Sequence, residues 1–225
     1  MSSPMTVLQI VSPETAPLLP ADTVEHALGL LLEFRLRHLP VVDSEGQLIG
    51  MVSEDQLLDA SGPDALLSSL YLARPIHATP DLHMFDATRM MMAHDLTMLA
   101  VADEDNAYLG LIRRSDLFER FATMLATQEP GTILLLEVPE RDYSLSQLVY
   151  ATEQTGARIL SVATEPHATE NGTVGVTLKL NVTDTSRVRH VLEHYGYKVV
   201  ALFGEEDDEE ALSIRVQEFM RYLEV

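Results

Sequence analysis

Residues 38–43 read HLPVVD, and residues 46–58 read GQLIGMVSEDQLL. The pattern returns sixty residues later, where residues 98–103 read MLAVAD and residues 107–118 read AYLGLIRRSDLF. Identities at this offset pair Pro20 with Pro80, Ala27 with Ala87, Leu39 with Leu99, Val41 with Val101, Asp43 with Asp103, Gly50 with Gly110, and Leu57 with Leu117. A long unit that occurs twice predicts two similar halves packed on each other rather than an open array. Clefts between such halves are places where ligands bind.

Each repeat predicts a helix, a strand, a turn, a strand and a second helix. In the first repeat, Asp22 to Glu25 has the sequence of a capping box, and apolar residues follow at helical spacing as far as Phe34. Short apolar strands at 39–42 and 48–52 flank a turn, and Ser53 caps the second helix. The second repeat predicts a helix over 81–93, strands over 98–101 and 108–112, and a helix over 115–125.

This element order and the strings quoted above resemble the tandem cystathionine β-synthase (CBS) domain pair over about residues 5–125. We expect repeats at about 5–60 and 65–125 within a first domain of residues 1–128. The resemblance implies a cleft for an adenosine nucleotide such as AMP, ADP or ATP. In that family the segment after the second strand commonly reads Gly-x-apolar-Thr/Ser-x-x-Asp, and its hydroxyl and carboxylate hold the ribose and phosphate.

The first repeat keeps part of this ligand pattern. It has the hydroxyl as Ser53 but carries Gln56 where the family has aspartate. The sequence Ser-x-x-Gln is also a capping box, so Ser53 and Gln56 could simply close the end of a helix. We therefore expect weak binding, or none, in this half.

The second repeat keeps the other part of the pattern. Asp116 supplies the carboxylate, and Arg113 stands in the position of the hydroxyl. Arg113 could bind a phosphate through two N–H donors while Asp116 accepts from ribose hydroxyls. Alternatively, the two side chains could pair with each other and close the site. An aspartate in the first turn of a helix is also favoured by the helix dipole alone.

The chain changes character after residues 128–131. Strands at 132–138, 157–163, 173–182 and 198–203 and helices at 144–155 and 186–195 follow in the order βαββαβ, the ferredoxin-like split arrangement. Residues 136–159, LEVPERDYSLSQLVYATEQTGARI, resemble the opening of an ACT domain, a small regulatory module. Many ligand-binding ACT domains have glycine where this chain has Tyr143, and Ser144 with Gln147 looks like a further capping box. We expect an ACT-like domain at 129–204, then an acidic linker and C-terminal helix at 205–225.

Composition limits the class of protein. The chain has 225 residues, 46% of them hydrophobic, which is enough to bury the cores of two domains. It contains no cysteine, which excludes disulfides, thiol nucleophiles and Cys-type zinc sites. No apolar run of eighteen residues and no basic-then-apolar start occurs, so we expect a cytoplasmic protein without a membrane span.

The formal net charge of −20 argues against binding to nucleic acid or to anionic membranes. Lys179 and Lys198 are the only lysines among fifteen cationic side chains. An acidic, lysine-poor surface would suit a salt-rich cytoplasm, where screening removes the self-repulsion. A GC-rich genome that favours arginine codons, with one acidic tail, would explain the same composition.

Other chemistry-bearing patterns are weaker. His190 and His194 are four residues apart on a predicted helix, but exposed helix histidines without a following glutamate are common, so we expect no metal site. The methionines at 84, 90–92 and 98 have the spacing of core packing. No catalytic triad order, P-loop or dinucleotide fingerprint occurs, so we expect neither an enzyme nor a bound cofactor.

The sequence therefore predicts an α+β protein, a CBS-domain pair followed by a βαββαβ ferredoxin-like, ACT-like domain. The leading hypothesis is a regulatory small-molecule-binding protein that senses an adenine nucleotide through Asp116, Arg113, Ser53 and Gln56. The alternative is a ligand-free dimerisation and interaction scaffold. In either case we expect a homodimer that acts on a protein partner whose identity the residues do not indicate.

Overall fold

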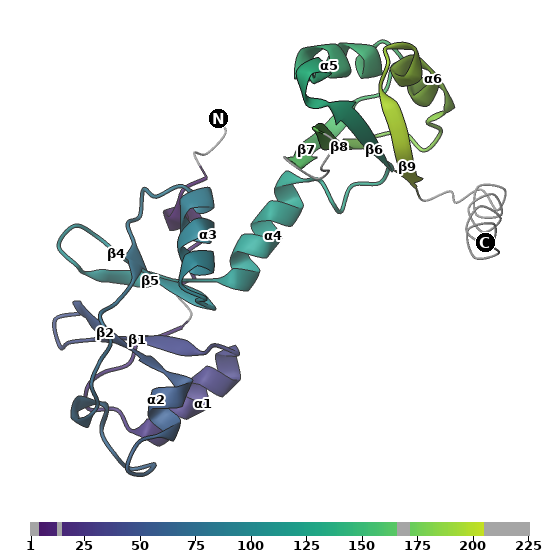
Figure 1. The fold of residues 1–225 in the computed structure, drawn as a ribbon. Coiled ribbons are helices and arrows are strands. Elements are labelled where there is room, and N and C mark those ends of the chain that lie inside the picture. The colour runs from purple at the N-terminus through teal and green to yellow at the C-terminus, as the bar shows by residue number, and fades with distance from the viewer. Residues whose placement is uncertain (1–4, 13–14, 166–171, 205–225) are drawn as a thin grey trace, which may run out of the picture. The chain divides into compact units, whose positions relative to one another are not determined.

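A computed structural model gives the fold of the chain (Figure 1). It describes residues 5–12, 15–165 and 172–204. The chain divides into two compact units, residues 1–120 and 121–225, each of which is treated by itself below. The division falls inside helix α4 (Arg114–Met124), ahead of the boundary at 128 expected from the sequence. No described helix combines the length and hydropathy that crossing a membrane needs.

Both repeats of the first unit have the predicted order of helix, strand, turn, strand and helix. The first consists of α1 (Val24–Phe34), β1 (His38–Val42), β2 (Leu48–Ser53) and α2 (Glu54–Leu58). The second consists of α3 (Met84–Ala93), β4 (Met98–Ala102), β5 (Tyr108–Arg113) and α4. In each repeat the two long strands pair antiparallel, and the second adds a two-residue strand, β3 (His77–Ala78), parallel to β4.

Two helix starts differ from the predictions. Thr23, not Asp22, is the N-cap of α1, because its side chain accepts a hydrogen bond from the amide of His26. The Asp22 carboxylate instead accepts from the amide of Leu19 at 2.7 Å. Helix α3 begins three residues later than predicted, with the His83 ring nitrogen accepting from the amide of Phe85. A polar cap therefore closes both of these helix starts, as backbone donors without helical partners require.

An approximate twofold relation joins the repeats. The amide of Leu48 donates to the carbonyl of Asn106 at 3.0 Å, and the amide of Tyr108, sixty residues after Leu48, donates to the carbonyl of Gly46 at 3.0 Å. Residues 51–60 and 111–120 also share one pattern of buried and exposed side chains position by position. The two halves are therefore packed on each other with equivalent surfaces in contact.

A short segment from outside each repeat packs on that repeat and completes its fold. The short 3-10 turn η1 (Val7–Gln9) packs on the second repeat, where the amide of Val7 donates to the carbonyl of Leu82 at 2.8 Å. The equivalent turn η2 (Leu67–Ser69) packs on the first repeat, where the amide of Leu67 donates to Asp22 at 2.9 Å. Both Val7 and Leu67 are fully buried. The N-terminal residues and the linker thus have matching structural roles.

The glycine of each repeated motif lets these connecting segments cross a strand. A Cβ on Gly50 would lie 2.6 Å from the Cβ of Leu72. A Cβ on Gly110, which has φ +139°, would lie 2.8 Å from the side chain of Val11. Glycine is required at both positions because a larger residue would displace the crossing chain.

The methionines form part of the core, as their spacing predicted. Met84, Met91 and Met98 are buried, whereas Met92 is 77% exposed. Leu39, Val41, Leu99 and Val101 are fully buried on β1 and β4. Because these strands are covered on both faces, their sequences are nearly continuous apolar runs.

The second unit is a four-stranded antiparallel sheet with two helices on one face (Figure 1). In chain order it consists of β6 (Thr132–Pro139), η3 (Glu140–Asp142), α5 (Leu145–Glu153), β7 (Ile159–Glu165), β8 (Thr173–Leu180), α6 (Ser186–His194) and β9 (Lys198–Phe203). The strand order is β7-β8-β6-β9, so the first strand lies inside the sheet. The predicted C-terminal helix, with its stripe of Leu212, Val216, Phe219 and Leu223, lies outside the described residues.

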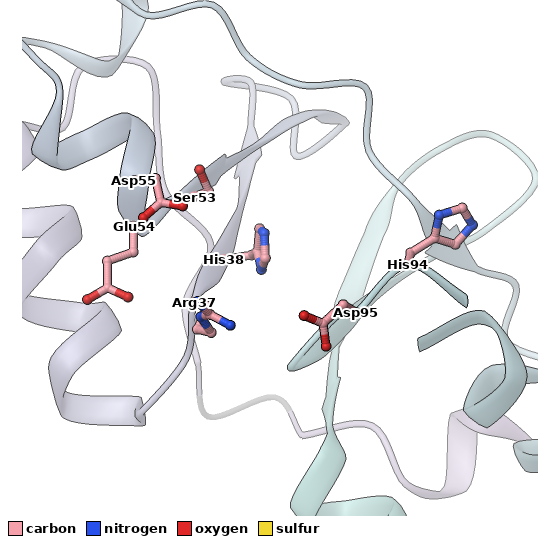
Figure 2. Close-up of a pocket in the computed structure, with 7 residues that line it drawn as sticks. All are labelled: Arg37, His38, Ser53, Glu54, Asp55, His94 and Asp95. Carbon is pink, nitrogen blue, oxygen red and sulfur yellow. The ribbon is translucent and has the colours of Figure 1, made fainter. Parts of the chain in front are cut away.

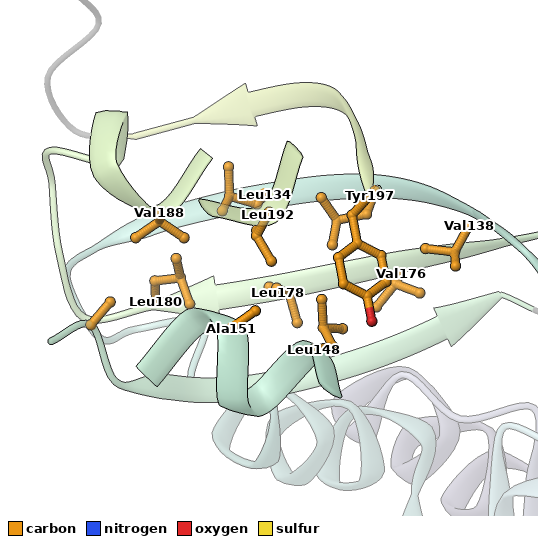
Figure 3. Close-up of a cluster of buried hydrophobic side chains, with 12 residues drawn as sticks. Leu134, Val138, Leu148, Ala151, Val176, Leu178, Leu180, Val188, Leu192 and Tyr197 are labelled. Carbon is orange, nitrogen blue, oxygen red and sulfur yellow. The ribbon is translucent and has the colours of Figure 1, made fainter. Parts of the chain in front are cut away.

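Alternation along the central strands places one core between the sheet and its helices. Leu134, Leu136, Leu178 and Leu180 are buried and pack with α5 and α6 residues such as Leu148 (Figure 3). Burial of a leucine of this kind contributes about 1.5–3 kcal/mol to stability. The residues between these core positions therefore lie on the other face of the sheet.

Candidate functional site

A pocket of about 240 Å³, open to solvent on one side and called the cavity below, lies between the repeats of the first unit (Figure 2). It is formed where β1 begins, where α2 begins and where α3 ends. Its lining residues are Arg37, His38, Ser53, Glu54, Asp55, His94 and Asp95. Of the four residues that the sequence singled out, the cavity includes Ser53.

Backbone geometry fixes both sides of this cavity. The amide of Glu54 donates to the carbonyl of Arg37 at 2.9 Å, which joins the start of α2 to the start of β1. The amide of Arg37 donates to the hydroxyl of Thr97 at 3.1 Å, which joins the two repeats. Asp95 follows α3 in the left-handed conformation, with φ +48°. This conformation costs a non-glycine residue free energy, although aspartate tolerates it better than most, and it sets the direction of the Asp95 side chain.

The cavity is acidic at neutral pH. Among the lining residues, Arg37 supplies one guanidinium group, whereas Glu54, Asp55 and Asp95 supply three carboxylates. His38 lies between Asp55 on one side and Asp95 on the other (Figure 2). Burial lowers the pKa of His38 and the Arg37 charge lowers it further, while Asp55 and Asp95 act in the opposite direction. His38 is therefore favoured in its neutral form, and its buried Nδ1 has no hydrogen-bond partner among the described residues.

Ser53 and Gln56 form the capping box that was the structural alternative for them. The Ser53 hydroxyl accepts from the amide of Gln56 at 3.3 Å, and the Gln56 side-chain oxygen accepts from the amide of Ser53 at 3.0 Å. The Gln56 amide nitrogen also donates to the carbonyl of Tyr71 at 3.1 Å. Gln56 is thus engaged on both of its polar atoms, whereas Ser53 still borders the cavity.

Arg113 and Asp116 contact each other in the second repeat. The Asp116 carboxylate accepts from the Arg113 amide at 2.8 Å and from the Arg113 Nε at 3.1 Å and 3.2 Å. Both side chains are largely buried, with exposed fractions of 29% for Arg113 and 15% for Asp116. Asp116 therefore does in the second repeat what Gln56 does in the first, because each closes the N-terminus of a helix.

The cavity contains residues that the ligand motif of the family does not include. Arg37 and His38 directly precede the buried run of β1, a position that could have marked them as the mouth of a cleft. His94 and Asp95 come from the other repeat, and only the packing of the two halves brings them to Ser53. The exposed Arg114 guanidinium also lies here, 3.4 Å from the Asp95 carboxylate.

The remaining sequence candidates lie in the second unit. Tyr143, the position at which the sequence resemblance led us to expect glycine, is half-buried and packs against the core of the second unit. Ser144 is the N-cap of α5, its hydroxyl accepting from the amide of Gln147 at 3.5 Å. His190 and His194 lie on α6. No group of three or more metal-binding side chains gathers anywhere in the described part of the chain.

Comparison with known families agrees with the repeat. The family model of the CBS domain matches residues 7–62 and again residues 68–123. Residues 7–123 are a tandem pair of CBS domains. The cavity therefore lies inside the CBS pair, beside the segment that carries the family's ligand motif.

Three similar proteins illustrate the range of chains that contain such a pair. Inosine-5'-monophosphate dehydrogenase of Methanocaldococcus jannaschii is 23% identical over 112 residues, which are 50% of this chain and 23% of that protein. A CBS domain pair/ACT domain protein of Thermotoga maritima is 21% identical, with a TM-score of 0.49, over 54% of this chain and 99% of that one. CBSX2, a CBS-pair protein of Arabidopsis thaliana solved in complex with AMP, is 24% identical, with a TM-score of 0.47, over 52% of this chain and 96% of that one.

Each of these matches covers about half of the chain. The chain spans about a quarter of the length of the first curated relatives that it matches. The dehydrogenase therefore shares a CBS pair with this chain rather than a catalytic domain. The ACT resemblance of the second unit stays a prediction.

Proposed function

We propose that this protein is a regulatory small-molecule-binding protein that senses an adenine nucleotide through its CBS pair. Other CBS pairs have been solved with such ligands, CBSX2 with AMP and the cytosolic domain of the Mg²⁺ channel MgtE with ATP. For this chain, the observation that carries the proposal is the cavity beside Ser53. The sequence favoured the second repeat, but there Arg113 and Asp116 engage each other.

The charges of the cavity favour a ligand with one phosphate group. The Arg37 guanidinium can bind a phosphate through paired N–H donors, and the Ser53 hydroxyl, which donates to the Gln56 side-chain oxygen at 3.3 Å, can donate to the same group only after it rotates away from Gln56. Glu54 and Asp55 oppose further negative charge, whereas Asp95 is paired with the Arg114 guanidinium at 3.4 Å. At about 240 Å³, the cavity is also smaller than the roughly 300–1,000 Å³ of sites that enclose a drug-sized ligand. AMP is therefore preferred to ATP, with part of the nucleotide outside the cavity.

The second repeat offers an alternative binding element, because Arg113 is not among the residues that line the cavity. Arg113 uses its Nε toward Asp116, and the guanidinium has further N–H donors on its two terminal nitrogens. Those donors can meet a phosphate while Asp116 holds the guanidinium in place. For Asp116 to accept from ribose hydroxyls instead, its contact with Arg113 must open. Gln56 serves the helix end and does not bind the ligand directly.

Calorimetric titration of the full chain with adenosine, AMP, ADP and ATP tests the proposal. We expect AMP to bind more tightly than ATP, and Arg37→Ala to weaken AMP roughly tenfold or more, because a hydrogen bond to a charged group is worth about 1.5–3 kcal/mol. Arg89→Ala is the matched control, because Arg89 is an arginine 79% exposed on α3 and outside the cavity. Equal AMP affinity in the wild type and Arg37→Ala would exclude this cavity. No heat with any of the four compounds would remove the sensing function.

One observation favours the alternative of a ligand-free interaction scaffold. Four large apolar side chains, at equivalent positions in the two repeats, stand exposed on the helices of the CBS pair. They are Leu32 at 82%, Met92 at 77%, Leu58 at 65% and Phe118 at 73%. Large exposed apolar side chains of this kind are typical of an association surface. Loss of self-association on mutating it, together with no nucleotide binding, would support the scaffold.

A further inference from the structure

His38 is a titratable residue at the centre of the charged groups of the cavity. It begins strand β1 directly after Arg37, and both residues line the cavity. Register pairs it with Ser53, the last residue of β2, which lines the cavity as well. Asp55 from the first repeat and Asp95 from the second lie on either side of the ring (Figure 2). The imidazole is therefore held beside the groups to which a phosphate is assigned above.

No hydrogen bond to the buried ring nitrogen fixes the charge of His38. Its Nδ1 is buried and has no partner among the described residues. A carboxylate partner at this atom would hold a proton on the ring, and a backbone amide that donated to it would keep the atom unprotonated. Because neither is present among the described residues, the charge of the ring follows the electrostatics of the cavity.

Two effects keep the ring neutral against two that oppose them. Burial is the larger effect that lowers the pKa of His38, and the charge of Arg37 lowers it further. The carboxylates of Asp55 and Asp95 raise it. The neutral form is therefore favoured in the free protein, although part of this preference depends on the single charge of Arg37.

Further charged and titratable groups lie around the cavity. Glu54, at the start of α2, and His94, which follows α3, also line it. The Arg114 guanidinium lies 3.4 Å from the Asp95 carboxylate and offsets its charge. Glu54 and Asp55 then still outnumber Arg37 among the lining residues. An incoming phosphate therefore adds negative charge where negative charge already predominates, which a proton on the ring would relieve.

A phosphate bound to Arg37 would change the balance at His38 in two ways. It neutralises the guanidinium, which is one of the two effects that keep the ring uncharged. It also brings up to two negative charges close to the ring, because the second pKa of a phosphate monoester is about 6. A nearby opposite charge shifts a pKa by about 1–3 in favour of the charged form. Both changes raise the pKa of His38.

We propose that His38 takes up a proton when the phosphate of a nucleotide binds to Arg37, so that nucleotide binding by the cavity strengthens as the pH falls. This inference rests on the proposed function and adds the proton as a second ligand of the same site. If the bound phosphate raises the pKa of His38 by about two, the ring gains about 0.8 of a proton midway between the free and bound values. Around that pH the affinity rises roughly sixfold for each pH unit of acidification.

Calorimetric titration with AMP in two buffers of different ionisation enthalpy, PIPES and ACES, counts the protons taken up on binding. The full chain is measured at pH 6.5, the ordinary pKa of histidine. His38→Asn replaces the ring with a polar group that does not titrate, and it also corrects for any proton that the AMP phosphate itself releases. We expect the wild type to take up roughly 0.5 proton or more above the value for His38→Asn. His26→Asn is the matched control, because His26 is exposed on α1 and outside the cavity, and it should match the wild type.

The outcomes separate this inference from the proposed function. Equal proton uptake in the wild type and His38→Asn, with AMP bound to both, would overturn the role of His38 and leave nucleotide sensing in place. No binding of AMP to the wild type at this pH or at more alkaline pH would remove the proposed function itself.

NMR of the wild type gives a second measurement that does not depend on whether the variant folds. The ring protons of the eight histidines report the titration of each ring. With saturating AMP, a histidine that titrates below pH 6.5 in the free protein should titrate at a pH higher by about 1–3. The resonance that is missing from the spectrum of His38→Asn identifies it. If no histidine titrates at higher pH with AMP bound, the proposal is wrong.

Discussion

Replacing Asp116 separates its structural role from a role in binding. In the free protein its carboxylate accepts from the amide of Arg113 at 2.8 Å and from the Arg113 Nε at 3.1 Å. Removing a helix-capping acceptor costs about 0.5–2 kcal/mol, and a partly exposed ion pair adds up to about 1 kcal/mol. We expect Asp116→Ala to lose about 1–2 kcal/mol of unfolding free energy. At roughly 4 °C for each kcal/mol in a unit of this size, its melting temperature falls by about 4–8 °C.

Differential scanning calorimetry without ligand measures this loss and can resolve the two units. Asp116→Asn keeps a capping acceptor and loses the charge, so we expect a loss of less than about 1 kcal/mol. Gln56→Ala is the matched substitution in the first repeat, where a neutral bond of 3.0 Å is removed. We expect about 0.5–1.5 kcal/mol there. A melting temperature of Asp116→Ala equal to that of the wild type would refute the contacts from which this reasoning starts.

The same variant reports on AMP. If Asp116 accepts from ribose hydroxyls, Asp116→Ala lowers AMP affinity roughly tenfold or more, equivalent to about 1.5–3 kcal/mol. If the nucleotide occupies only the cavity beside Ser53, its affinity is unchanged while the unfolding temperature still falls. The pair of measurements therefore decides which repeat binds the ligand.

Three further predictions concern charge, assembly and pH. The net charge of −20 repels itself less when salt screens it, and in molar KCl the screening length is about 3 Å. The protein should therefore melt at a higher temperature in molar KCl than in dilute buffer. An unchanged melting temperature would count against adaptation to a salt-rich cytoplasm. Light scattering should report a homodimer that becomes monomeric when Leu32 and Met92 are replaced with glutamate. Tyr71→Glu is the control, because Tyr71 is 86% exposed and lies outside the helices, and it should leave the mass unchanged. A monomeric wild type would contradict the expected dimer. Because the pKa of His38 in the folded state is below its ordinary 6.5, its stabilising effect is present above pH 6.5 and is lost as the pH falls through the lowered value. The unfolding free energy of the wild type, measured relative to that of His38→Phe, should therefore fall below pH 6.5, and a constant difference would show that His38 does not titrate in this way.

Local sequence determined the elements of the first unit, because apolar spacing and turn residues act over a few positions. The identities sixty residues apart predicted two equivalent halves, and the equivalent hydrogen bonds at Leu48 and Tyr108 follow from that equivalence. Errors fell at helix starts such as Asp22, where the side chain bonds to the amide of Leu19 instead of capping the helix. Several residues there could cap, and only the path of the preceding chain selects among them.

Only part of the candidate site could be predicted from the sequence, and the physical reason is different. Ser53 and Gln56 lie one helical turn apart, so their capping box could be inferred from spacing alone. The cavity also needs His94 and Asp95, which are about forty residues further along the chain. Their position beside Ser53 depends on how the repeats pack, and no local pattern encodes that packing. The sequence by itself therefore determined the repeat, its elements and its family, whereas only the tertiary structure decided where the cavity lies and that carboxylates predominate among its charged groups.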